Sequence, residues 1–387
     1  MSRNYEDRNN ASFRKYRRRR NLFIIEIVVL LLVCAGGFVY FQMNTQLDKI
    51  DIETLDEEQV IVNQEAETDP VLKGYTNIAL FGTDSREGIS AAANTDAILI
   101  ASINNDTKVV KLVSIYRDTY LNIGNDRYRK ANSAYANGGP EQAITMLNTN
   151  LDMDIRSYLT VDFNAMVDIV DALGGIEITV DDEECIHLNN YCVETSQVTG
   201  AEYENLPGAG TYLMNGVQAV SYTRIRFTAG NDFKRTERQR EVIAKIIDKA
   251  RRADLSTLNE VMDKVFPKIK TNITKSEIIS MGLGMLSYEM GETVGFPFTR
   301  RTSSDRASNE VPITLESNVE QLHEFLFENE RYIPSRTVLE RSARIIDLTG
   351  YDENTSASDE NYRATGEDLV GNNSSAEREV ETETQEW

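Results

Sequence analysis

A run of twenty mostly apolar residues, Leu22 to Phe41, constrains most strongly what this chain can fold into. At a rise of about 1.5 Å per residue, a helix of this length spans about 30 Å, the thickness of the hydrocarbon core of a bilayer. The preceding residues 1–21 carry eight Lys and Arg side chains against two acidic ones. Because basic flanks stay in the cytoplasm, the sequence predicts a cytoplasmic tail at 1–21, a single transmembrane anchor at 22–41 and an extracellular remainder.

Two other interpretations of this run are a cleaved signal peptide and a lipoprotein signal. The run is longer than the apolar part of a signal peptide, and no clear small-residue cleavage site precedes the acidic stretch that follows. Cys34 ends a faint lipoprotein pattern, but Val33 occupies the position where a small residue belongs. Glu26 is the one charge in the run, and it lies close enough to the preceding arginines to pair with them. We therefore expect an uncleaved anchor in the cell membrane.

Composition divides the rest of the chain into three parts. Residues 42–75 are acidic and weakly periodic, which is typical of a stalk. Residues 76–345 suffice for one large domain, and residues 346–387 are acidic with few apolar side chains, which predicts a disordered tail. The whole chain has a net charge of −21, and the large domain is itself acidic. An acidic extracellular domain argues against a nucleic acid as a partner.

Apolar runs with strand character alternate with helical patterns in the large domain. Strands are expected at residues 77–81, 96–103, 109–115, 156–161 and 176–180, around Val294 and at 311–315. Helices are expected at residues 141–150, 163–173, 215–221, 276–285 and 319–327, together with a long helix that ends near Arg251. The alternation predicts an α/β domain, layered as α/β/α around a mixed central sheet.

The segment from Tyr222 to Arg240 is unusually basic for so acidic a protein. Its six basic side chains, which stand against only Asp232 and Glu237, are Arg224, Arg226, Lys234, Arg235, Arg238 and Arg240. Arginine is the side chain that binds phosphate with a planar, bidentate donor. The segment therefore predicts an anion site, and a solvated, charged helix is the alternative.

The spacing of these arginines predicts how they converge. Arg224 and Arg226 lie two apart, so in an extended segment both point to one face. The next helix carries a stripe with helical spacing, made of Arg235, Arg238 and Gln239. Asp232 is expected at the N-cap of that helix, whose N-terminus itself favours anions.

Charged residues also mark the ends of the predicted strands. Asp84 follows the first strand and Asp96 begins the second, so both could hold a divalent cation at one edge of the sheet. Arg117 and Asp118 follow the third strand, which is where sites in α/β proteins tend to assemble. Ordinary turn chemistry for the aspartates, and a structural Arg–Asp pair, are the alternatives.

Two cysteines, Cys185 and Cys192, bracket a short stretch that reads as a loop outside the membrane. In that environment a disulfide can persist, and we predict one between them, with two free thiols as the alternative. A zinc site lacks ligands, because the chain holds only two histidines and His187 alone lies nearby.

Seven short motifs follow one another between residues 76 and 250. They are TDSR at 83–86, TD at 95–96, SIYRDT at 114–119, KANSAYA at 130–136, ALGGIE at 172–177, LMNGVQA at 213–219 and the arginine-rich stretch at 224–239. In content and order they resemble the LytR-CpsA-Psr family, whose members are membrane-anchored enzymes of Gram-positive cell envelopes. The predicted anchor with its basic leader is similar to that family as well.

The resemblance implies a phosphotransferase. Such enzymes move a glycopolymer, which is a teichoic acid, a capsule or a related wall polymer, from a polyprenyl-pyrophosphate carrier to peptidoglycan through a phosphodiester. The side chains that the resemblance implies in pyrophosphate binding are Arg117, Arg224, Arg226 and Arg235, with Arg238 and Gln239 in support. It implies that Asp84 and Asp96 hold Mg²⁺ (or Mn²⁺) beside them. The implied catalytic residues are Asp96, Arg117 and Arg226, and an apolar cleft is expected for the lipid tail.

This chain departs from the family pattern at two positions. Asn94 stands where the family usually has Arg, and Tyr116 stands where Pro is common. The missing cation favours an alternative function, that of a non-catalytic polyprenyl-phosphate-binding or regulatory protein of the cell envelope. The acidity of the domain and its predicted extracellular placement argue against a DNA-binding regulator. A Ser-His-Asp hydrolase is not expected, because neither His187 nor His323 has a G-x-S-x-G partner.

Overall fold

The computed structural model describes residues 45–56, 58–83, 94–226, 231–284, 287–303, 308–357 and 359–360. The predicted cytoplasmic tail at 1–21, the predicted anchor at 22–41 and Asp84 lie outside these residues. Within them, no helix combines the length and apolar character that a membrane crossing requires. The chain divides between Lys49 and Ile50 into two units, and the second unit contains all the elements described below.

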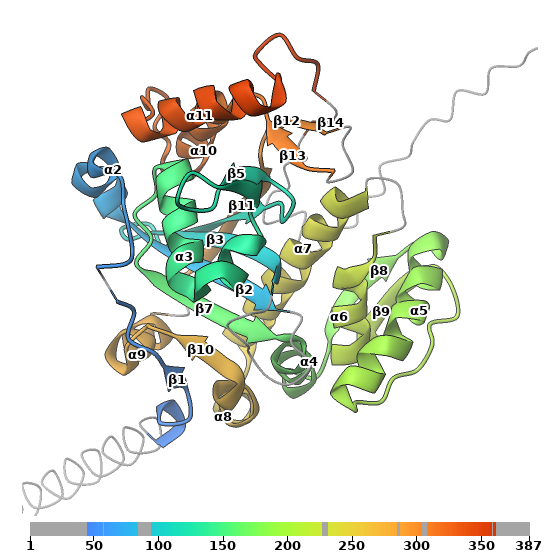
Figure 1. The fold of residues 1–387 in the computed structure, drawn as a ribbon. Helices are drawn as coiled ribbons and strands as arrows, with labels where there is room; N and C mark the ends of the chain where they lie inside the picture. The colour runs from blue at the N-terminus through green and yellow to red at the C-terminus, as the bar shows by residue number, and fades with distance from the viewer. Residues whose placement is uncertain are drawn as a thin grey trace, which may run out of the picture. The chain divides into compact units, whose positions relative to one another are not determined.

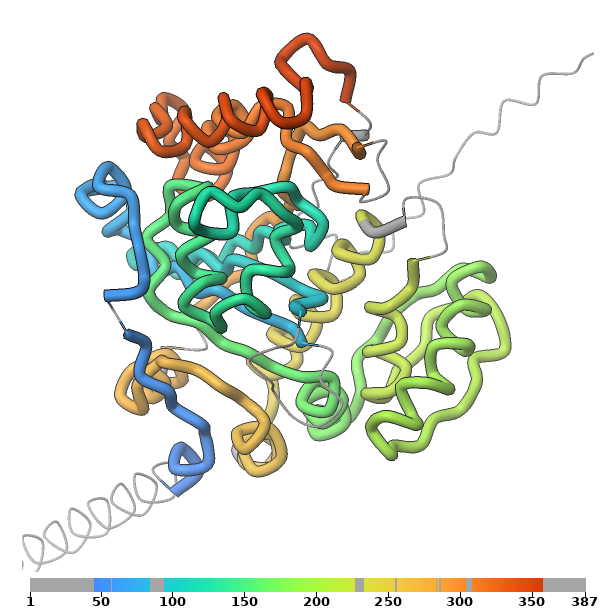
Figure 2. The backbone as a smooth tube through the Cα atoms, viewed as in Figure 1, coloured from blue at the N-terminus to red at the C-terminus, as the bar shows by residue number. Residues whose placement is uncertain are grey.

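A mixed sheet of seven strands forms the centre of the second unit (Figure 1). In spatial order its strands are β1 (Asp51–Ile52), β10 (Ile269–Thr271), β7 (Ser157–Asp162), β2 (Tyr75–Thr83), β3 (Thr95–Asn104), β4 (Val109–Ile115) and β11 (Glu289–Phe296). The pairs β1–β10, β7–β2 and β4–β11 are parallel, and the other three are antiparallel. Figure 2 shows β7 beside β10, which lies far from it in the sequence.

The remaining elements are helices and short strands. The helices are α2 (Gln64–Thr68), α3 (Ser133–Leu151), α4 (Phe163–Ala172), α5 (Asp182–Thr199), α6 (Gly216–Arg224), α7 (Asn231–Arg252), α8 (Leu255–Val265), α9 (Lys275–Leu283), α10 (Leu315–Phe327) and α11 (Arg336–Thr349), with 3₁₀ turns η1 (Leu72–Gly74) and η2 (Phe266–Lys268). The short strands are β5 (Tyr120–Asn122), β6 (Tyr128–Lys130), β8 (Ile176–Val180), β9 (Gly210–Met214), β12 (Thr299–Thr302), β13 (Glu310–Pro312) and β14 (Asp359–Glu360).

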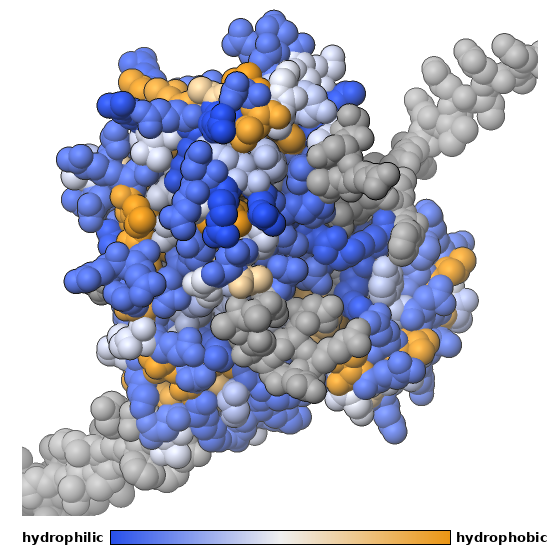
Figure 3. All heavy atoms as spheres, in the orientation of Figure 1, coloured by the Kyte–Doolittle hydropathy of each residue, from blue (hydrophilic) through white to orange (hydrophobic). Residues whose placement is uncertain are grey.

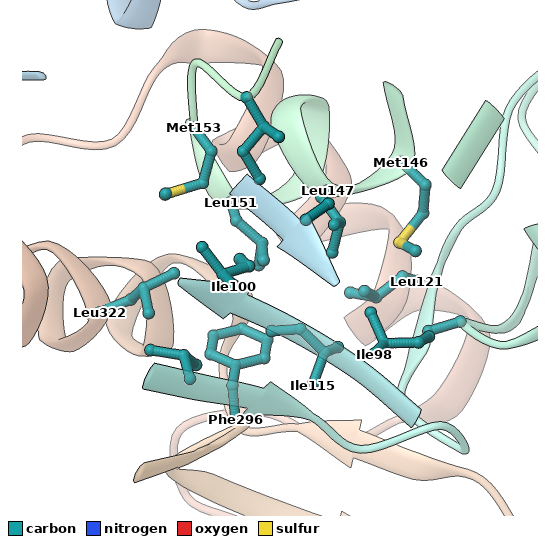
Figure 4. Packing of buried hydrophobic residues seen from close by; sticks show 14 of the residues in the cluster. Ile98, Ile100, Ile115, Leu121, Met146, Leu147, Leu151, Met153, Phe296 and Leu322 are labelled. Atoms are coloured by element: carbon teal, nitrogen blue, oxygen red, sulfur yellow. The ribbon is translucent and has the colours of Figure 1, made fainter. Parts of the chain in front are cut away.

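Helices cover both faces of the central sheet, because its inner strands alternate apolar side chains between the two faces. On one face Ile98 and Ile100 of β3 pack with Leu147 of α3 and Leu322 of α10 (Figure 4). On the other face a smaller cluster joins apolar side chains of β2, β3 and β4 to those of α7 and α9. Outside these layers, hydrophilic side chains cover most of the described surface on the face drawn in Figure 3. The predicted α/β/α layering around a mixed sheet is confirmed.

A second hydrophobic cluster forms where α4, α5 and α6 pack around the β8–β9 pair. Val167 of α4, Leu188 of α5 and Val220 of α6 are among its buried members. This small unit, which Figure 1 shows beside α7, carries the residues directly before the arginine-rich segment.

The folded region is longer than predicted at both ends. Residues before 76 were expected to form a stalk, but β1 joins the edge of the central sheet and Val60, Ala66 and Leu72 lie in the main core. At the other end α11 continues to Thr349, past the boundary predicted at residue 345. Both stretches are rich in acidic residues and show little periodicity, so the sequence pattern did not indicate the apolar side chains that anchor them.

The disulfide prediction is wrong, because the stretch between the cysteines is part of helix α5. Asp181 caps this helix, and its side chain accepts a hydrogen bond from the Glu184 amide in a capping box. Cys185 and Cys192 are both buried free thiols. They lie seven positions apart along the helix, which places them about 10 Å from each other, beyond the reach of a disulfide. Burial raises the pKa of the Cys192 thiol to about 11.

The extended segment predicted around Arg224 and Arg226 is also wrong. Asn215 caps α6, and its side chain accepts a hydrogen bond from the Gln218 amide, so the helix continues to Arg224. Ile225, directly after the helix, has an extended backbone. Asp232 lies inside α7 rather than before it, since that helix begins at Asn231.

Gly216→Ala tests the close packing of α6 on α4. A Cβ at Gly216 would lie 2.7 Å from the Cα of Val167 and 2.8 Å from its carbonyl carbon, and backbone atoms cannot rotate away. We expect the free energy of unfolding in urea to fall by about 1–3 kcal/mol. Gly282→Ala is the matched control, because nothing lies within 4 Å of its Cβ and the helix gains propensity. Equal effects of the two substitutions would contradict this packing.

Candidate functional site

Three arginines from separate parts of the chain surround the carboxylate of Asp96. Arg117 donates a hydrogen bond from Nη1 to Asp96 Oδ1 at 2.8 Å. The Nη2 atoms of Arg226 and Arg235 lie 3.7 Å and 3.5 Å from the same oxygen. Arg235 Nη2 also donates to the backbone carbonyl of Asp96 at 3.1 Å. These four predicted site residues therefore form one cluster.

The sheet register explains why Asp96 meets Arg117. Strands β3 and β4 are antiparallel, and Leu99 pairs with Ser114. Continuing that register by three residues places Asp96 opposite Arg117, just beyond the end of β4. The first turns of α7 supply Arg235, and the segment between α6 and α7 supplies Arg226.

The charges of this cluster favour the ionised form of Asp96. Burial alone would raise the pKa of the Asp96 carboxyl, but the charges of Arg235, Arg117 and Arg226, with the Arg117 hydrogen bond, outweigh it and lower the pKa. Asp118 balances further charge, because Lys130 Nζ lies 2.9 Å and Arg117 Nε 3.6 Å from its carboxylate. Among the described residues, four basic side chains thus lie around the carboxylates of Asp96 and Asp118, and guanidinium groups gathered in this way suit an anion.

An apolar cavity of about 290 Å³ adjoins the arginine cluster. Its walls come from β2, β3, β7, α4, α6 and α7, and they include Phe81, Met166 and Ile243. Polar and charged side chains line it as well, and those from the predicted site are Asp96, Arg224, Arg235 and Gln239. A cavity of this kind can hold a hydrocarbon chain whose charged end reaches the arginines.

Two of the predicted phosphate-binding arginines form ion pairs with glutamates of α5. The sequence interpretation missed these two glutamates. Arg238 is 3% exposed and donates from Nε and Nη2 to Glu184 Oε1 at 3.0 Å and 2.8 Å, and from Nη1 to the carbonyl of Ile225. Arg224 Nη2 pairs with Glu194 at 2.8 Å, and its guanidinium lies over the Phe163 ring. No local signal predicts these contacts, since they join residues far apart in sequence.

A buried arginine outside the known motifs packs against Tyr116, the residue directly before Arg117. Arg300 of β12 is fully buried, and its guanidinium lies 3.7 Å from the ring centroid of Phe233 and 4.7 Å from that of Tyr116. Its Nε lies 3.6 Å from Glu310. Tyr116 thus replaces the usual proline with a ring that packs against this cation.

The predicted metal site is only partly within the described residues. Asp84 lies outside them, and among those described no group of three His, Cys, Asp or Glu side chains could hold a metal ion. Asp96 is the one described member of the predicted pair. Its three guanidinium contacts all reach Oδ1.

Asp96→Asn tests the balance of charge in the cluster. The substitution leaves three guanidinium groups facing one another, so we expect the free energy of unfolding to fall by about 1–3 kcal/mol at pH 7. Because the pKa of Asp96 is lowered in the folded state, its contribution is complete above about pH 4 and is lost as the pH falls through the lowered value.

Denaturant unfolding between pH 3 and pH 7 measures this difference. Asp248→Asn is the matched control, since its partner Arg252 is 72% exposed and the pair should contribute no more than about 0.5 kcal/mol. A loss for Asp96→Asn that is as large at pH 3 as at pH 7 would contradict the assignment.

Glu184→Ala tests the support of Arg238. Removing the carboxylate leaves a buried guanidinium without its counter-charge, so we expect a loss of about 3 kcal/mol in the free energy of unfolding. Arg238→Met in the same background should recover part of it, and a double-mutant cycle measures the coupling. Glu194→Ala should cost less, because the Glu194 side chain is 45% exposed. Equal losses at both glutamates would show that burial does not decide the effect.

Comparison with known proteins gives the family. A model described as the LytR_cpsA_psr family matches residues 37–322. The polyisoprenyl-teichoic acid–peptidoglycan teichoic acid transferase TagU of Bacillus subtilis is 29% identical over 271 residues, which cover 67% of this chain and 80% of the relative. TagT of the same organism is 25% identical over 284 residues, 71% of this chain and 85% of the relative.

A solved structure shows the same fold. The protein gbs0355 from Streptococcus agalactiae superposes with a TM-score of 0.55 at 23% identity, covering 70% of this chain and 93% of that one. The family match spans well over half of the chain and contains the whole arginine cluster. The chain therefore belongs to the LytR_cpsA_psr family.

Proposed function

We propose that this protein is a membrane-anchored phosphotransferase that attaches a polyprenyl-pyrophosphate-linked glycopolymer to peptidoglycan. The observation that carries the proposal is the contact between the arginine cluster around Asp96 and the apolar cavity of about 290 Å³. A polyprenyl pyrophosphate combines a hydrocarbon chain with a pyrophosphate, and the site offers a surface for each. Relatives named as teichoic acid transferases support the same reaction.

The arginines perform most of the work that this chemistry requires. Phosphoryl transfer depends on positioning and on charge stabilisation more than on covalent help from side chains. Arg117, Arg226 and Arg235 bind the pyrophosphate oxygens, and Arg224 and Gln239 contact it from the cavity. Arg238, which Glu184 holds, keeps α7 in place behind them. Because the guanidinium groups are already gathered in the free protein, little reorganisation opposes the transition state.

The reaction exchanges one phosphorus–oxygen bond for another. A sugar hydroxyl of peptidoglycan attacks the phosphorus that carries the glycopolymer, and the bond from that phosphorus to the bridging oxygen breaks. Polyprenyl phosphate leaves, and the glycopolymer remains joined to peptidoglycan through a phosphodiester. An aspartate of the site accepts the hydroxyl proton, and Asp96 takes this role where the cation does not occupy the whole carboxylate. Its lowered pKa makes it a weak base, which suits a loose transition state in which the proton leaves late.

The proposal includes a divalent cation, Mg²⁺ or Mn²⁺, held by Asp84 and Asp96. Such an ion would neutralise charge on the phosphate oxygens. The proposal also includes a transmembrane anchor at 22–41, a cytoplasmic N-terminus and an extracellular catalytic domain, which the basic leader at 1–21 supports. Extracellular placement gives the domain access to peptidoglycan.

A transfer assay with the full-length protein tests the function. The protein is incubated with a synthetic polyprenyl-pyrophosphate glycan, peptidoglycan oligomers and Mg²⁺, and mass spectrometry detects the glycan–phosphate–peptidoglycan product. We expect product with the wild type and none after EDTA treatment. Arg226→Ala should lower the rate about 10²–10³-fold, as loss of one charge-stabilising donor does. Arg336→Ala is the matched control. The Arg336 side chain is 85% exposed, and it pairs with Glu340 of the same helix, α11.

One other outcome would favour the alternative function. Asn94 is an exposed amide in place of the usual arginine, and this substitution is the observation in favour of a non-catalytic polyprenyl-phosphate binder. Arg226-dependent binding of the donor without any product, under conditions in which the relatives turn over, would overturn the transferase and support the binder.

A further inference from the structure

A groove of about 400 Å³ lies beside the arginine cluster and is separate from the apolar cavity. It is built on the β5–β6 hairpin and on the first residues of α3. The side chains that line it are Asn94, Tyr120, Tyr128, Arg129, Lys130, Asn132, Ser133 and Asn309. Two aromatic rings, three amides, a hydroxyl and two basic side chains are thus gathered on one surface.

This mixture matches a sugar better than a hydrocarbon, and one of the two basic side chains, Lys130, is paired with Asp118. The ring centroids of Tyr120 and Tyr128 are 6.1 Å apart, and the rings are tilted by 40°, so they form a broken apolar platform on which the C–H face of a sugar can pack. Amide groups both donate and accept hydrogen bonds, as hydroxyl and acetamido groups require. Asn94 supplies one of these amides, where the family usually has a cation.

The platform is held in place before any ligand binds. Tyr120 and Tyr128 are half-buried and pack against the main hydrophobic core. Their strands are paired in register, with Tyr120 opposite Lys130 and Asn122 opposite Tyr128. A rigid aromatic surface loses little conformational entropy on binding, so it can contribute affinity even when it is shallow.

Direct contacts connect the groove to the reacting centre. Lys130, which lines the groove, pairs with Asp118, and Asp118 in turn lies 3.6 Å from Arg117. The backbone amide of Asn132 donates to the carbonyl of Arg117 at 3.0 Å. Arg117 contacts Asp96, so a ligand in the groove lies next to the residues that bind the pyrophosphate.

We propose that this groove binds the glycan strand of the acceptor, a chain of N-acetylated amino sugars, and orients its hydroxyl toward Asp96. This inference rests on the proposed transferase function. The hydrocarbon end of the donor already has a place in the apolar cavity, and the arginines take its pyrophosphate. The groove beside Lys130 offers rings and amides that neither of those two surfaces has, which suits the glycan of the second substrate.

Steady-state transfer kinetics with Tyr128→Ser test the groove. The serine removes the ring and keeps a hydroxyl, so we expect the KM for peptidoglycan oligomers to rise about 3- to 10-fold, with the donor KM and kcat nearly unchanged. Asn309→Ala is a second variant. The hydrogen bonds between Asn309 and Ser303 use the backbone of Asn309, so they persist when its side chain is removed. Tyr288→Ser is the matched control, on a half-buried tyrosine that lines a different cavity.

A direct binding measurement separates this inference from the transferase itself. Saturation-transfer NMR with chitotetraose, a soluble chain of N-acetylglucosamine, should detect binding to the wild type and to Tyr288→Ser, and a weaker signal with Tyr128→Ser. An unchanged acceptor KM, or a rise in the donor KM instead, would contradict glycan binding in the groove. Chitotetraose binding that Tyr128→Ser and Asn309→Ala leave unchanged would contradict it as well. If the wild type makes no product, the proposed transferase activity is wrong. The chitotetraose experiment still shows whether the groove binds the glycan.

Discussion

The contact of Asp96 with three arginines is the interaction on which the site depends. Arg117, Arg226 and Arg235 come from three different parts of the chain, and without a carboxylate among them their charges would repel one another. Asp96 stays ionised in this setting because the guanidinium charges lower its pKa more than burial raises it. The protein can therefore gather positive charge before an anion arrives, and a pyrophosphate would complete the balance of charge.

The small unit around β8 and β9 has a consistent role in this arrangement. Its helix α5 presents Glu184 and Glu194 to Arg238 and Arg224, so two further arginines are paired from outside the central sheet. The unit also walls part of the apolar cavity through α4 and α6. The same elements thus shape the place for a hydrocarbon chain and hold the cations at its end, which links the stability of the unit to the proposed binding of the donor.

Local patterns predicted much of this architecture, and long-range contacts account for what they missed. The strands at 109–115 and 176–180 have the predicted bounds, because an apolar run reveals the first, which is mostly buried, and strict alternation reveals the second, which is half-buried. Asp96 and Arg117 could be placed together because both lie at strand ends. Helix α5 was missed because its buried stripe is short and its two cysteines suggested a loop. The partners of Arg238 and Arg300 had no local signal at all, since only the tertiary fold brings them together.

Isothermal titration calorimetry with geranylgeranyl pyrophosphate is the most direct test of the arrangement, because this ligand carries both the hydrocarbon and the pyrophosphate that the site is proposed to bind. We expect the full-length protein to bind it more tightly than either geranylgeraniol or inorganic pyrophosphate, with affinity that falls as salt rises. Arg226→Gln should weaken binding of the pyrophosphate but not of geranylgeraniol. Equal affinity for geranylgeranyl pyrophosphate and geranylgeraniol would show that the arginine cluster does not bind the anion and would contradict the proposed site.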